Sequence, residues 1–200
     1  MKIVNQGVEL ELDFRKVLSS GFRYGISGNL TFIDNEVQKS PYSVIPSGTA
    51  AGPGLSSTAI NGYISGYPIG SFFLKEFIGF DDKGLNAFRD VNGDGIITDA
   101  DRVIAGTALP NKMFNISGNV GYKGFDFSVS FNGVSGNKVY DNTANGNSYK
   151  LRLSKGLNIT HAALTDPAES VSNSAPVSTR YLKDAKYFRL NNMALGYTVN

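Results

Sequence analysis

The sequence predicts an all-β protein on two observations: strict alternation of apolar and polar residues in several segments, and an abundance of glycine and aromatic residues. Successive side chains of a strand point to opposite faces, so an alternating segment has one apolar and one polar face. The 23 Gly, 13 Phe and 10 Tyr among 200 residues favour strands joined by turns over helices. We therefore expect strands to build the domain.

Residues 7–34 are predicted to form the first hairpin. Its first strand has the clearest alternation of the sequence, with Val8, Leu10, Leu12 and Phe14 set against Glu9, Glu11, Asp13 and Arg15. A short connection at 18–21 leads to a second strand, in which Tyr24, Ile26 and Leu30 share the apolar face. A short turn between alternating segments is typical of an antiparallel hairpin.

Residues 35–110 are predicted to form a long loop region. The alternation stops at about Asp34, and Pro, Gly, Ser and Thr replace it as far as Gly70. A loop of this length is uncommon in a compact domain and indicates either a function or disorder. Within the region, residues 71–80 are expected to add a strand.

Residues 90–101 of this region match the calcium-loop pattern D-x-[DN]-x-[DN]-G with an acid at the twelfth position. Side-chain oxygens, one backbone carbonyl at the seventh position and a closing acid would supply the hard ligands that Ca²⁺ prefers. Gly95 permits the sharp turn. The expected metal ligands are Asp90, Asn92, Asp94, Ile96, Thr98 and Asp101.

An Asp/Asn/Gly turn whose side chains bond their own backbone is the alternative for this loop. The twelfth residue is Asp101 where calcium loops usually have Glu, and no amphipathic helix precedes Asp90. A helix-pair calcium sensor is therefore not expected. We expect a structural calcium ion, with the neighbouring Asp99 as a solvated acid.

Residues 111–138 are predicted to form a second hairpin, with Lys123-Gly124 as its tight turn. Residues 139–185 form another polar loop, with a short helix expected around 149–155. Residues 186–199 are predicted to form the last strand. The apolar faces of these three strands are Phe114, Ile116, Val120 and Tyr122; Phe125, Phe127, Val129 and Phe131; and Met193, Leu195, Tyr197 and Val199.

Composition argues against several functions. The 19 basic and 17 acidic residues are scattered, so no nucleic-acid partner is expected. The chain has no Cys, and its one histidine, His161, lies in a polar stretch with no partner in view, so no enzyme is expected. Two alternatives to a membrane protein are a secreted β-sandwich that binds carbohydrate and uses structural calcium, and a dockerin-like module. The second would need a duplicated loop with helices.

Five motifs, in order and over nearly the whole chain, resemble the C-terminal part of the SusC/RagA-type TonB-dependent transporters of the Bacteroidetes outer membrane. They are Asn-Gln-Gly-Val-Glu-Leu-Glu-Leu at 5–12, Gly-Tyr-Pro-Ile-Gly-Ser-Phe-Phe at 66–73, the loop at 90–101, Tyr-Lys-Gly-Phe-Asp at 122–126, and Arg-Tyr-Leu-Lys-Asp-Ala-Lys-Tyr-Phe-Arg-Leu-Asn-Asn at 180–192 with Leu-Gly-Tyr-Thr at 195–198.

The resemblance implies a segment of a large antiparallel barrel of about 22 strands around a plug. It also implies a place in the Gram-negative outer membrane, in contact with its lipid, and import of glycans or peptides with TonB and a SusD-like lipoprotein. The natural protein is expected to be longer, because TonB would act through N-terminal parts. The turns at 18–21 and 123–124 would face the periplasm and the long loops the outside. Glu9, Glu11, Asp13, Arg23 and Asp126 would line the lumen, as solvated charges or as substrate contacts.

Overall fold

The computed structural model describes residues 1–51 and 58–199. The chain divides into two compact units. The sheet unit comprises Val4–Asn35, Leu109–Asn137 and residues 185–199. The loop unit comprises Met1–Ile3, Glu36–Ala108 apart from residues 52–57, and Lys138–Asp184. None of the helices in the described ranges is long and apolar enough to cross a membrane.

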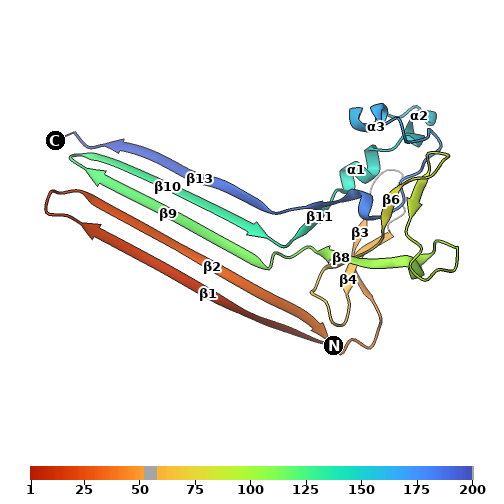
Figure 1. Ribbon diagram of the computed structural model, residues 1–200, viewed down its shortest axis with the longest axis horizontal. Helices are drawn as coiled ribbons and strands as arrows, with labels where there is room; N and C mark the ends of the chain where they lie inside the picture. Colours follow the sequence, from red (N-terminus) through yellow and green to blue (C-terminus); the bar gives the residue numbers. More distant parts are fainter. Residues whose placement is uncertain (52–57, 200) are drawn as a thin grey trace. The chain divides into compact units, whose positions relative to one another are not determined.

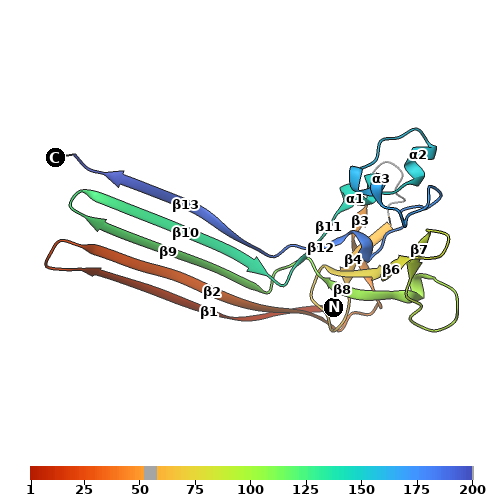
Figure 2. The same cartoon turned by 45° about the horizontal axis from the view of Figure 1, so that its top comes forward.

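The sheet unit contains one antiparallel sheet of five strands in the order β1-β2-β9-β10-β13 (Figures 1 and 2). The strands are β1 (Lys2–Val17), β2 (Arg23–Gln38), β9 (Lys112–Tyr122), β10 (Phe125–Ser135) and β13 (Tyr187–Tyr197). Each one lies where the alternating pattern predicts a strand. The middle of the sheet joins segments that are far apart in sequence, because β2 pairs with β9 from Arg23↔Gly121 to Phe32↔Lys112.

The Lys123-Gly124 turn between β9 and β10 has φ of 48° at Lys123 and 85° at Gly124. Positive φ at both central residues is the backbone of a type I′ turn, whose twist suits two-residue hairpins. The register is regular from Phe125↔Tyr122 to Ser135↔Lys112. The pairing of β10 with β13 is antiparallel too, with an irregularity between Ser130 and Phe131.

The loop unit is not purely irregular, which corrects the expectation of a continuous loop from about Asp34 to Gly70. A four-stranded sheet has the order β3-β4-β5-β8. Its strands are β3 (Ile45–Ala50), β4 (Thr58–Tyr63), β5 (Ser71–Lys75) and β8 (Arg102–Thr107). Pro46 and Gly48 break the β3–β4 register twice, so no alternating pattern marks these strands in the sequence. Residues 52–57 of the expected loop lie outside the described part.

Smaller elements complete the loop unit. They are the hairpin β6 (Phe77–Phe80) and β7 (Asn86–Phe88), the pair β11 (Lys138–Tyr140) and β12 (Leu182–Asp184), three helices α1 (Asn142–Asn147), α2 (Leu151–Ser154) and α3 (His161–Thr165), and 3₁₀ turns η1 (Asp99–Asp101) and η2 (Thr179–Tyr181). The α2 helix lies within the range expected for one. His161 begins α3, which Thr160 caps by accepting a hydrogen bond from the Ala163 N–H.

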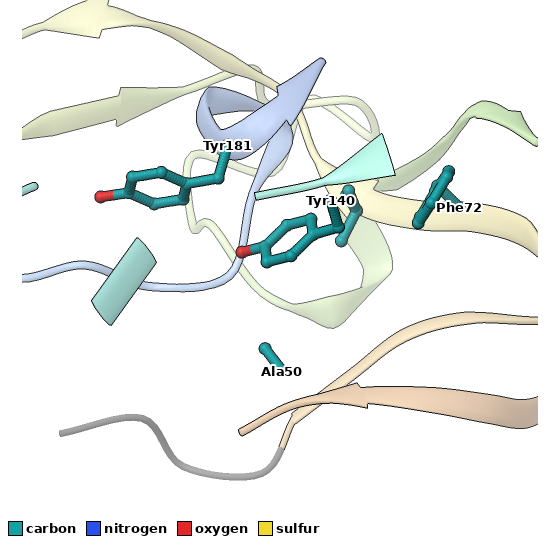
Figure 3. Packing of buried hydrophobic residues seen from close by; sticks show 5 residues of the cluster. Ala50, Phe72, Tyr140 and Tyr181 are labelled. Carbon is teal, nitrogen blue, oxygen red and sulfur yellow. The ribbon is translucent and has the colours of Figure 1, made fainter. Parts of the chain in front are cut away.

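The core of the loop unit is a cluster of Ala50, Phe72, Leu74, Tyr140 and Tyr181 (Figure 3). The rings of Tyr140 and Tyr181 meet edge to face with centroids 6.3 Å apart. These residues come from β3, β5, β11 and η2. The core therefore unites both long loop regions of the sequence, 35–110 and 139–185.

Candidate functional site

The five-stranded sheet has one continuous apolar face. The registers place Tyr24, Val120, Phe127 and Leu195 in one row across four strands, and Ile26, Gly118, Val129 and Met193 in the next. Side chains of a register row share a face. This face is exposed: Leu10 is 57%, Met193 63% and Leu195 76% accessible. A β-sandwich would bury such a face, so the exposure of these described side chains does not favour the β-sandwich alternative.

Aromatic rings gather at both ends of the apolar face. Near the turns, Phe22 lies 5.8 Å from Tyr24 and 6.1 Å from Tyr122, and Phe125 lies 4.4 Å from Tyr197, between ring centroids. At the far end, Phe188 stacks on Phe131 at 5.2 Å and on Phe114 at 5.8 Å. Aliphatic side chains and two glycines, Gly28 and Gly118, occupy most of the space between these groups.

The opposite face of the sheet is polar. Asn29, Asn115 and Asn132 form one row, and Ser27, Ser117 and Ser130 the next. Asn115 Nδ2 donates to Asn29 Oδ1 at 2.8 Å. All five charged residues expected to line a lumen lie exposed on this face: Glu9, Glu11, Asp13, Arg23 and Asp126.

Near the turns, glycines leave room on this face for charged side chains. Arg23 and Asp126 both pair with Gly121, and Asp126 also pairs with Gly196. A Cβ at Gly121 would lie 2.2 Å from Arg23 Nε, and one at Gly196 would lie 2.6 Å from Asp126 Oδ2. The two charged side chains therefore lie flat against the neighbouring strands.

The candidate calcium loop at 90–101 is held by its own side chains. Asp90 accepts hydrogen bonds from the N–H groups of Gly93 and Gly95 at 2.7 and 2.8 Å, and Asp94 accepts one from Ile96 at 2.8 Å. Asn92 Oδ1 accepts from the Asp94 N–H at 3.1 Å. Gly95 has φ of 80°, which agrees with the sharp turn expected there.

Asp101, the last residue of the candidate calcium loop, bonds to backbone N–H groups at both ends of that loop. Its side chain is fully buried, and it accepts hydrogen bonds from the N–H groups of Val91 at 2.9 Å and Thr98 at 2.7 Å. These backbone donors, Thr98 first, lower the pKa of the Asp101 carboxyl below its ordinary value. Asp101 is therefore held as a carboxylate that fixes both ends of the loop.

These hydrogen bonds leave oxygen lone pairs of the loop free for a metal, but the loop side chains do not form a complete metal site. A carboxylate has about four lone-pair positions, so the oxygens of Asp90 and Asp94 that accept one N–H can each bind a cation as well. In the described ranges, no group of three or more His, Cys, Asp or Glu side chains is placed to hold a metal. Asp99, expected to be solvated, pairs with Arg102 at 3.1 Å.

A second polar centre, which no sequence motif indicates, lies in the loop unit around Arg180. Arg180 Nη2 lies 2.9 Å from Glu169 Oε2, and the two side chains are only 13% and 0% exposed. Asn173 Nδ2 donates to the other oxygen of Glu169 at 2.7 Å, and the Arg180 guanidinium lies over the rings of Phe77 and Phe80 at 5.5 and 5.0 Å. Phe77 and Phe80 are distant from Arg180 in sequence, and Glu169 and Asn173 lie in a polar stretch without alternation, so no periodic pattern indicates these partners.

Comparisons with known proteins agree with this architecture. The chain is 28% identical over 212 residues to the TonB-dependent receptor SusC of Bacteroides thetaiotaomicron, which covers 97% of the chain. It is 30% identical over 125 residues, or 56% of the chain, to the TonB-dependent receptor P26 of Formosa agariphila. The solved RagAB peptide transporter superposes on 99% of the chain with a TM-score of 0.76 at 19% identity.

The chain is similar to the SusC/RagA-type TonB-dependent receptors. This confirms the resemblance seen in the five motifs, and the RagAB match confirms the all-β fold of an outer-membrane barrel segment. No protein-family model matches the chain. The chain spans 20% of the length of SusC, 12% of receptor P26 and 23% of the matched RagAB chain.

Proposed function

We propose that this chain forms part of the wall and outer loops of a TonB-dependent transporter in the Gram-negative outer membrane. One observation carries the proposal: a sheet with an exposed apolar face and a polar opposite face, in a chain similar to SusC. Outer-membrane barrels alternate lipid-facing and lumen-facing residues in this manner. The receptors it resembles are not enzymes, and we propose import rather than catalysis.

The spacing of the aromatic groups supports a membrane position. Phe114 and Tyr122 are eight residues apart on β9, or about 27 Å along a strand. A strand tilted by about 40° would cover about 20 Å of membrane height, close to the apolar band of about 25 Å in outer-membrane barrels. The sheet also needs neighbours at its β1 and β13 edges, because hydrocarbon cannot satisfy free backbone groups.

We further propose that the transported substrate is a glycan or a peptide captured by a SusD-like lipoprotein at the outer loops. Two relatives support this substrate class: the TonB-dependent receptor SusC and the solved RagAB peptide transporter. The test uses a strain that lacks the gene for the complete protein, grown on single glycans or peptide mixtures. Loss of growth on one class, reproduced by deletion of TonB, is expected. Unchanged growth and uptake on every nutrient would count against transport.

For the loop at 90–101 we propose a structural calcium ion held by Asp90, Asn92, Asp94, Ile96, Thr98 and Asp101. The supporting observation is that the loop already has the required sharp turn at Gly95, with Asp90, Asn92 and Asp94 close together. The bound cation would rigidify the outer loops and take no part in chemistry.

Calorimetric titration of Ca²⁺ into the complete protein tests this ion. Asp94→Ala is expected to abolish the binding heat, because it removes one of the few charged ligands. Asp99→Ala is the matched control, since Asp99 lies in the same loop but pairs with Arg102. Equal heats for wild type and Asp94→Ala would remove the metal and leave a turn closed by its own hydrogen bonds.

A further inference from the structure

The apolar face of the sheet unit contains a hollow of about 440 Å³ between β1, β2 and β9. Leu12, Ile26, Leu30, Phe114 and Ile116 are among the side chains that line it, together with Gly28. The hollow lies between the two aromatic groups. All of the residues that line it belong to this one sheet.

Gly28 is the reason for the hollow. It lies on the apolar face in register with Ile116, where the neighbouring positions of β2 carry Ile26 and Leu30. A Cβ at Gly28 would lie 2.8 Å from the backbone oxygen of Asn115, so the sequence leaves this position without a side chain. The lining is apolar and offers water too few partners. An empty hollow would also forfeit dispersion contacts, which a flexible hydrocarbon chain can restore.

A positive charge lies beyond the hollow, at the end away from the turns. Lys112 is the first residue of β9, exposed, and in register with Phe32 on the apolar face, two residues before Phe114. Within the described residues its ammonium makes no ion pair. A lysine ammonium is a compact charge that binds phosphate well. The charge and the hollow therefore match the two halves of a phosphate-bearing lipid.

We propose that this groove binds one acyl chain of a phosphate-bearing membrane lipid, with the phosphate at Lys112. The proposal rests on the membrane position proposed above. It assigns the occupant from the hydrocarbon nature of the lining and from the charge of Lys112 at its end.

The test is native mass spectrometry of the complete protein released from bilayer discs of phosphatidylethanolamine and phosphatidylglycerol. Wild type is expected to retain one phosphatidylglycerol molecule. Lys112→Gln is expected to weaken this retention about fivefold, the effect of one lysine charge at an anionic surface. Lys123→Gln is the charge control, because Lys123 lies in the turn at the other end and contacts Tyr122.

Ile116→Phe tests the hollow, because the larger side chain fills it and leaves Gly28 unchanged. It is expected to abolish the retention of phosphatidylglycerol. Met193→Phe is the matched control on the same exposed face, outside the hollow. Equal lipid retention in wild type, Lys112→Gln and Ile116→Phe would overturn the proposal, as would loss of a dimer rather than of lipid in Ile116→Phe. A wild-type protein that inserts but retains no lipid overturns this inference alone, whereas failure to insert overturns the proposed membrane function as well.

Discussion

At the residue scale, the loop unit depends on a few buried polar side chains as well as on its small apolar core. Asp101, Glu169 and Asn173 are almost inaccessible, and each accepts or donates hydrogen bonds with good geometry. Burial is costly for such groups unless each one is paired. Pairing of this kind makes the arrangement of the loops specific, because alternative arrangements would leave charges unsatisfied.

Tyrosines in the same core show the effect of burial on ionisation. Burial away from solvent raises the pKa of Tyr181 to about 12. The same cause raises the pKa of Tyr140 well above its ordinary value. Both rings therefore stay neutral at physiological pH. Tyr140 uses its hydroxyl as a hydrogen-bond donor to Asn145 at 2.9 Å.

The buried pair Arg180 and Glu169 gives a prediction at this scale. Glu169→Ala leaves the guanidinium of Arg180 buried without a counter-charge, which is expected to destabilise the loop unit by about 3–5 kcal/mol. Glu76→Ala is the control: Glu76 pairs with Arg89 at a similar distance of 3.1 Å, but the side chains of Arg89 and Glu76 are 60% and 35% exposed. Its expected cost is about 0–1 kcal/mol. Limited proteolysis of the complete protein in detergent measures both, and equal cleavage of the two variants would contradict the prediction.

At the element scale, the β9–β10 hairpin shows how register and turn chemistry agree. The type I′ turn aligns Phe125 with Tyr122, and the alternate pairs from there to Gly133↔Phe114 keep their apolar residues on one face. A shift of one residue would move the whole apolar set to the polar face. The Lys123-Gly124 turn therefore helps to decide which side of the sheet is apolar.

Lys123 is strained in this turn, because only Gly and, to a lesser degree, Asn and Asp adopt positive φ readily. Lys123→Asn is expected to stabilise the hairpin by up to about 1 kcal/mol, and Gly124→Ala to destabilise it by about 1–2 kcal/mol. Urea unfolding of the complete protein in lipid vesicles measures both. A lower midpoint for Lys123→Asn, or no change for Gly124→Ala, would show that the turn conformation contributes nothing to stability.

At the scale of the whole molecule, the decisive property is which solvent covers each face of the sheet. An exposed apolar face that runs across several strands is rare on soluble monomers and usually marks contact with a protein or a membrane. On β2, β9 and β10 the polar face has rows of Asn and Ser in its middle and the charges of Arg23 and Asp126 near the turns. The edge strands β1 and β13 add the charges of Glu9, Glu11, Asp13 and Arg189. This distribution is expected of a wall with hydrocarbon on one side and water on the other.

Val129 and Ser128 are adjacent residues of β10 on opposite faces, and they test this property directly. Val129→Arg places a charge near the middle of the apolar band and is expected to cost about 2–4 kcal/mol. Ser128→Arg adds the same charge to the polar face and is expected to be nearly neutral. The measurement is the folded fraction of the complete protein in outer membranes. It is read from the electrophoretic migration of samples that are not heated before loading. Similar losses for both variants would be inconsistent with a lipid-covered face.

The five long strands, their two faces and the short turns could be predicted from the amino-acid sequence, because side-chain alternation is a local property of a strand. The turn at Gly95 and the family resemblance could be predicted from it as well. The pairing of β2 with β9, the single core shared by the two loop regions and the contact of Arg180 with Glu169 became visible in the folded chain. The β2–β9 pairing and the shared core join residues far apart in the chain. Arg180 and Glu169 are 11 residues apart, in a stretch without alternation. The strands β3 and β4 show no alternation because Pro46 and Gly48 interrupt their ladder. Alternation reports which face a residue occupies, whereas the choice of neighbouring strand depends on long-range packing that leaves no periodic trace.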